Sequence, residues 1–193
     1  MLPRIATLAV LASLVAAAPL AAQFSDNDVY RPIDFTVGGG IAIPLKTFRE
    51  LSKTGLVGQV GVEFMPSGQI PVGFRVNAVY EHLDGKPPLG LLNHDRRLIG
   101  GIAELLLHVP LDEHTRWDPY VFAGGGFYHQ SLTDLPGNPS GTHVAFQGGL
   151  GLAAGIGALR PFLEVQAQSV FLDGPNVKTV PIVVGVRIGR RKK

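Results

Sequence analysis

Residues 179–189 read TVPIVVGVRIG and alternate between two kinds of side chain, a pattern that narrows the possible folds more than any other in the sequence. The even-numbered positions are all apolar and branched: Val180, Ile182, Val184, Val186 and Ile188. The odd-numbered positions are mostly small or polar: Thr179, Pro181, Val183, Gly185, Arg187 and Gly189. A period of two indicates a β-strand whose two faces meet different surroundings. Such a strand exposes an edge unless another strand pairs with it, so this segment predicts a partner elsewhere in the chain.

Seven more segments show the same alternation. They cover residues 33–43, 54–64, 71–82, 96–109, 119–131, 142–156 and 160–172. Each is long enough to supply the ~9–11 residues that a tilted membrane-spanning strand needs, and no segment has a sustained helical period. The glycines at 124–126 leave the facing of the fifth segment open. We therefore predict an all-β fold of eight strands.

The two faces of these strands differ sharply in charge. The third segment places Val72, Phe74, Val76, Ala78 and Tyr80 opposite Gly73, Arg75, Asn77, Val79 and Glu81. Across all segments the polar faces carry a small, mixed set of charges: Asp34, Glu63, Glu81, Glu104, Glu164, Arg75 and Arg187. This set suits a narrow interior in which carboxylates and guanidinium groups pair. The apolar faces carry almost no charge, as a lipid-facing belt requires.

A soluble, lipocalin-like barrel holding an apolar ligand would turn its polar faces to water, and it is the alternative to a membrane barrel. The polar faces here have too few charges and too many glycines for an outer surface: charged residues make up 17% of the chain and hydrophobic residues 46%. Aromatic residues near strand ends suit interfacial girdles. These are Phe64, Tyr80, Trp117, Tyr120 and Phe171. We predict an eight-stranded antiparallel up-and-down transmembrane β-barrel.

The connections between the predicted strands favour one orientation. The first, third, fifth and seventh are mostly long loops, whereas the second and sixth are short turns. Transmembrane barrels have long extracellular loops and short periplasmic turns. Closure requires residues 179–189 to pair antiparallel with residues 33–43, so that Arg187 points into the lumen.

The chain ends flank the barrel with segments of different composition. Residues 1–22 have the positive start, apolar run and small-residue end of a secretory signal peptide. We expect a short polar lead over residues 23–32, the barrel over residues 33–189, and a basic tail over residues 190–193. Residues 23–189 carry a net charge of −3, because Arg4 and the four basic tail residues account for five positive charges in a chain of net +2. The basic pI therefore does not indicate nucleic-acid binding.

Three stretches resemble a known family. They are residues 33–40 (IDFTVGGG), residues 119–126 (PYVFAGGG) and the last strand. The mature chain looks like the small outer-membrane β-barrel proteins of the OmpA/OmpX type. The resemblance implies a location in the bacterial outer membrane, contact with its bilayer, insertion by the barrel-insertion machinery, and a monomer. Such chains usually end on an aromatic residue, and here Ile188 occupies that position.

One pair of side chains raises the alternative of a lipid-modifying hydrolase. His129 precedes Ser131 by two residues, and outer-membrane lipid A deacylases are similar in having a His-x-Ser pair with a glutamate. The next glutamate is Glu164, a strand and a loop away, and Leu132 replaces the asparagine that follows serine in those enzymes. We therefore predict that the protein is not an enzyme.

No other motif indicates a catalytic, cofactor or metal site. Residues 149–154 (GLGLAA) match a loose dinucleotide-binding fingerprint but lie inside an alternating strand. The six histidines show no metal-ligand spacing, and there is no cysteine. An eight-stranded barrel is just wide enough to be filled by its own side chains. We expect a structural or interaction protein with a closed lumen, whose outer loops carry any binding surface.

Overall fold

The computed structural model describes residues 33–45, 52–66, 71–85, 95–109, 111, 116–132, 140–155, 159–172 and 176–189. The predicted signal peptide (1–22), lead (23–32) and basic tail (190–193) lie outside these residues. In the described part of the chain, no helix is long and apolar enough to cross a membrane.

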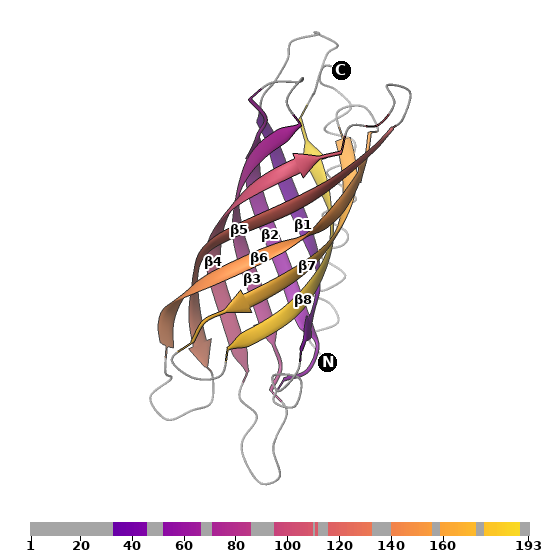
Figure 1. Ribbon diagram of the computed structural model, residues 1–193. Coiled ribbons are helices and arrows are strands. Elements are labelled where there is room, and N and C mark those ends of the chain that lie inside the picture. The colour runs from indigo at the N-terminus through magenta and orange to yellow at the C-terminus, as the bar shows by residue number, and fades with distance from the viewer. Residues whose placement is uncertain are drawn as a thin grey trace.

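Eight antiparallel strands close into one barrel in sequence order (Figure 1). Their bounds are β1 Ile33–Pro44, β2 Gly55–Phe64, β3 Val72–Leu83, β4 Arg96–His108, β5 Trp117–Leu132, β6 Ser140–Ala154, β7 Leu159–Val170 and β8 Val177–Ile188. β8 pairs with β1, with Val37 opposite Val186 and Ile41 opposite Ile182. The predicted closure of the barrel by the last strand is confirmed.

The strand register fixes the width of the barrel. Following the cross-strand partners once around from Arg187 on β8, through Thr36 on β1, ends on Val177 of the same strand, ten residues away. Eight strands with this stagger tilt by roughly 40° to the barrel axis and leave an interior that side chains can fill. Figure 1 shows the strong tilt of the strands.

Side chains alternate between the lumen and the outer wall as predicted. On β3, the apolar positions from Val72 to Tyr80 are exposed, whereas Arg75, Asn77 and Glu81 are fully buried. The strand whose facing the sequence left open, β5, points Tyr120, Phe122, Tyr128 and Gln130 inward. Tyr120 is therefore not a girdle residue, and that prediction is wrong: it is 1% exposed, because it follows the inward-facing set of β5. The other four aromatics of the predicted girdles are exposed: Phe64, Tyr80, Trp117 and Phe171.

Strands approach too closely at some inward glycines for any side chain to fit. A Cβ atom on Gly40 would lie 1.8 Å from the carbonyl oxygen of Ile182, and one on Gly126 would lie 1.9 Å from that of Gly101. Glycine therefore permits the tight curvature of a small barrel at these points.

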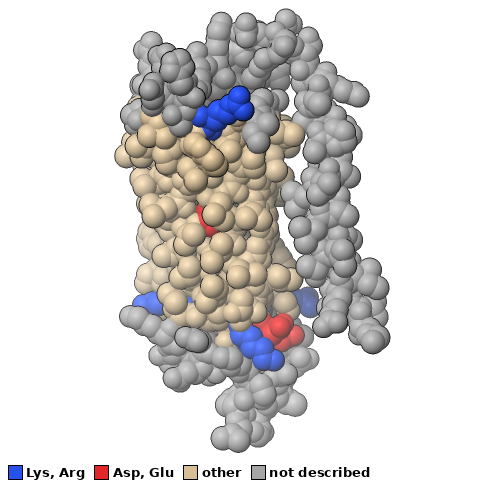
Figure 2. Space-filling model, turned by 90° about the vertical axis from the view of Figure 1, so that its right-hand side faces the viewer, with Lys and Arg blue, Asp and Glu red and all other residues tan. Residues whose placement is uncertain are grey.

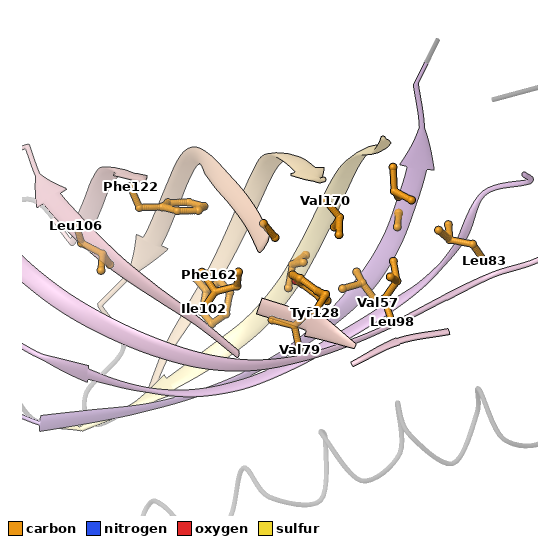
Figure 3. Packing of buried hydrophobic residues seen from close by; sticks show 14 of the residues in the cluster. Val57, Val79, Leu83, Leu98, Ile102, Leu106, Phe122, Tyr128, Phe162 and Val170 are labelled. Carbon is orange, nitrogen blue, oxygen red and sulfur yellow. The ribbon is translucent and has the colours of Figure 1, made fainter. Parts of the chain in front are cut away.

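One end of the lumen is lined by apolar side chains. We call this end, where β1 meets β2, β3 meets β4, β5 meets β6 and β7 meets β8, the loop end, and the opposite end the terminal end. Near the loop end lie four side chains that are 0% exposed: Leu83, Leu98, Val170 and Val177. Figure 3 shows three of them among the other buried apolar residues inside the barrel. Apolar side chains therefore fill part of the lumen near the loop end.

Candidate functional site: a charge network inside a lipid-facing wall

The centre of the lumen is organised around Arg75 on β3. Its Nε donates to Glu104 Oε2 at 2.7 Å, and its Nη1 donates to Glu164 Oε1 at 2.5 Å. All three side chains are fully buried, and the guanidinium group lies 5.0 Å from the centre of the Phe122 ring. One cation thus links carboxylates from β4 and β7 across the barrel, and charge-assisted hydrogen bonds of this kind are the strong ones.

Neutral donors complete the hydrogen bonding of these two carboxylates. Glu104 accepts from Asn77 Nδ2 at 2.8 Å and from Gln147 Nε2 at 2.7 Å. Glu164 accepts from Gln166 Nε2 at 2.9 Å and from Tyr120 Oη at 2.7 Å. Because a buried charge is costly unless its partners are in place, these donors make an ionised network tolerable in the lumen.

The terminal end of the lumen holds a second group of charges. Arg187 Nε lies 3.4 Å from Glu63 Oε2, and the guanidinium group stacks over Tyr120 at 4.2 Å from the ring centre. His108 Nδ1 lies 2.6 Å from Asp118 Oδ1. The predicted inward position of Arg187 among carboxylates is confirmed.

Arg160 and Asp34 form a further buried pair near the terminal end. The sequence placed Asp34 in the lumen but did not identify its partner, because the stagger between strands decides which inward side chains meet. Toward the loop end, Glu81 accepts from Gln168 Nε2 at 3.0 Å, beneath the apolar layer. Polar side chains, hydrogen-bonded to one another, therefore occupy the lumen from the terminal end through the centre, up to the apolar layer near the loop end.

The outer wall is the reverse of the lumen. Exposed apolar side chains cover it along every strand, from Phe35 on β1 to Ile188 on β8. On the face shown in Figure 2, charged side chains gather at the two ends, and the wall between them is almost entirely uncharged. Water would solvate such a surface poorly, whereas a bilayer matches it.

A polar row marks the loop end of this wall. In the strand register, His82, Arg97, Ser131 and Ser140 lie opposite one another on four neighbouring strands. The next outward row toward the middle contains Tyr80 and Ile99 on β3 and β4, but His129 and Thr142 on β5 and β6. The row after it is free of polar side chains: Ala78, Gly101, Phe127 and Val144. The change from polar to aromatic and aliphatic side chains indicates the level at which a membrane interface would lie.

Comparison with solved structures also indicates a membrane barrel. Neisserial surface protein A is 13% identical with a TM-score of 0.62, and the match covers 83% of this chain and 98% of that one. The fold is that of a small outer-membrane β-barrel. Ail of Yersinia pestis (13% identity, TM-score 0.53, 83% and 100% covered) and a major outer membrane protein of Thermus thermophilus (12% identity, TM-score 0.54, 82% and 99% covered) share it. No protein-family model and no curated protein matches the chain.

These findings confirm the predicted fold class and the resemblance to the OmpA/OmpX type of barrel. At 12–13% identity, the likeness shows the fold alone. The apolar outer wall supplies the evidence for the environment of the barrel, because a bilayer matches such a wall and water does not. The barrel is therefore embedded in the lipid of the outer membrane, and the soluble-barrel alternative is not supported.

The structure does not assemble the hydrolase site that the sequence raised as an alternative. His129 is exposed on the outer wall, where its Nδ1 lies 3.2 Å from Thr142 Oγ1. Glu164 is fully buried in the lumen and lies level with Tyr120 in the strand register, nine residues along β5 from His129, which corresponds to roughly 30 Å. His129, Ser131 and Glu164 therefore cannot act together. Residues 149–154 lie inside β6, so the dinucleotide fingerprint also lacks its strand-to-helix context.

Proposed function

We propose that the protein is an outer-membrane barrel of structural or interaction type, with a closed lumen and any binding surface on its loop end. The observation that supports this function most strongly is the filled lumen. Arg75, with its two carboxylates and their amide and hydroxyl donors, occupies the centre, and fully buried apolar side chains lie near the loop end. A wall with this interior can anchor and present loops, but it offers no wide aqueous path.

The loop end is the outward-facing end in this proposal. The longest connections, residues 45–54 and 84–95, both leave the barrel there. Long loops on a rigid scaffold are the usual location of binding surfaces. Ail, which shares the fold, was determined in complex with the heparin analogue sucrose octasulfate, so a barrel of this fold can bind a ligand. We further propose that the barrel-insertion machinery inserts the protein. We also propose a monomeric state, since closure leaves no strand edge to pair with another copy.

Two measurements test this function. In planar bilayers, the folded protein is expected to produce no steady, large-pore current, and a sustained current of that kind would contradict the closed lumen. Folding in the same membranes is verified by electrophoresis of unheated and heated samples, because a folded barrel migrates differently from the chain that heating has unfolded.

The orientation is tested separately with epitope tags in intact cells. A tag within residues 86–94 should be labelled from outside, whereas the matched control, a tag within residues 112–115, should require permeabilisation. Labelling of the control tag alone would reverse the orientation, and with it the proposed binding end.

A further inference from the structure

His82, Asp84 and Asp95 meet at the loop end, outside the lumen network. One ligand atom from each lies within 4.8 Å of the corresponding atoms of the other two. His82 Nε2 is 3.3 Å from Asp84 Oδ1. In a tetrahedral site with metal–ligand bonds of about 2.1 Å, ligand atoms lie roughly 3.4 Å apart, so small side-chain rotations would bring the three into range.

The backbone already holds these side chains in place. His82 stands on β3 between Leu56 and Arg97 of the neighbouring strands. The Asp84 carbonyl oxygen accepts from Lys53 N at 2.8 Å, and Gly85 pairs with Ser52 in an isolated bridge. Gly85 N also donates to Asp95 Oδ1 at 3.3 Å, which orients that carboxylate. Such contacts to a ligating carboxylate are typical of metal sites.

The charges of the cluster also favour a cation. Two carboxylates close together repel one another, and a divalent ion would offset both charges at once. Arg97 lies opposite His82 in the register, and its positive charge would compete with a metal ion for the two carboxylates. It is a cross-strand neighbour of His82 and not a member of the cluster.

We propose that His82, Asp84 and Asp95 form a binding site for a divalent transition-metal ion of the zinc class. Ca²⁺ and Mg²⁺ take oxygen ligands, whereas an imidazole nitrogen together with carboxylate oxygens suits Zn²⁺ and its neighbours in the series. Three protein ligands leave one coordination position open to solvent, since Asp84 is about half exposed. Asp84 and Asp95 flank the connection between β3 and β4, so a bound ion ties its two ends together.

Titration calorimetry on the untagged, folded barrel in zwitterionic detergent tests the site. Zn²⁺ is expected to bind one ion per chain, and Ca²⁺ and Mg²⁺ are expected not to compete at a tenfold excess. Co²⁺ should give the visible absorption of a four-coordinate nitrogen and oxygen site. Each of His82→Gln and Asp95→Asn should weaken Zn²⁺ binding at least tenfold.

The matched control is His129→Gln, which removes another histidine, exposed on the outer wall. It should bind Zn²⁺ as the wild type does, and every variant should retain its heat-dependent shift in electrophoresis. Absence of stoichiometric Zn²⁺ uptake, or an equal loss in His82→Gln and His129→Gln, would overturn the proposal. Preference for Ca²⁺ would overturn the assignment of the metal class.

Discussion

Removing Arg75 should destabilise the barrel more than the loss of any surface charge. In Arg75→Met, the side-chain volume is largely kept, but Glu104 and Glu164 lose the cation that sits 2.7 Å and 2.5 Å from their oxygens. Breaking a buried ion pair by removing one partner costs about 3–5 kcal/mol, because a charge remains buried without compensation. That range corresponds to a decrease of roughly 200- to 5,000-fold in the folding equilibrium constant.

A triple variant separates the lost cation from the lost volume. Arg75→Met combined with Glu104→Gln and Glu164→Gln leaves a neutral set of hydrogen-bonding groups, and replacement of a complete buried charge set is often neutral. We therefore expect the triple variant to recover most of the stability that the single variant loses. Arg97→Met is the control, because Arg97 is exposed at the loop end and its removal should cost less than about 1 kcal/mol.

Urea unfolding of the barrel in lipid vesicles measures these differences. The chain has one tryptophan, Trp117, which is 56% exposed on the outer wall, so its fluorescence reports transfer from lipid to water. A loss below about 1 kcal/mol in Arg75→Met would refute the role given to the central cation. So would a triple variant that is no more stable than the single one.

Three other substitutions, two of them paired with a control, test the wall, the network and the strand packing by the same unfolding assay. Val76→Arg, in the middle of the outward face of β3, should lower the free energy of unfolding by about 2–4 kcal/mol. Its control, Val72→Arg near the strand end, should lower it by about 0–1 kcal/mol. Equal losses would argue against a bilayer around the wall. Tyr120→Phe removes a hydrogen bond to a buried carboxylate and should cost about 1.5–3 kcal/mol; an unchanged midpoint would show that this contact does not form. Gly40→Ala should lose at least about 2 kcal/mol, because its Cβ would meet a backbone oxygen, and Gly58→Ala, where nothing lies within 4 Å, should be tolerated.

Most of the fold could be predicted because the two faces of each strand meet different surroundings. Alternation identified eight strands to within two residues at each end, and it placed Arg75 and Arg187 in the lumen. The facing of β5 was hidden by three consecutive glycines, which carry no side chain to mark a face. Without a known facing for β5, Tyr120 was assigned to a girdle only because it lies near a strand end, and this explains the error.

The specific contacts could not be predicted, because they depend on the stagger between strands. Alternation shows that Asp34 points inward, but only the register brings it to Arg160. The same holds for His82 and Asp95, which are brought together by the pairing of β3 with β4. A search for histidine spacing alone misses such a cluster, because Asp95 lies thirteen residues from His82, beyond the connection between β3 and β4.

Closure of the barrel by β1 and β8 is the central claim, and NMR of the protein in lipid tests it most directly. Cross-strand contacts are expected between Val37 and Val186 and between Ile41 and Ile182, the register that gives the ten-residue stagger. These contacts should appear together with those between β1 and β2. Absence of the β1–β8 contacts while the other strand pairs are intact, or a register shifted by two or more residues, would contradict the account.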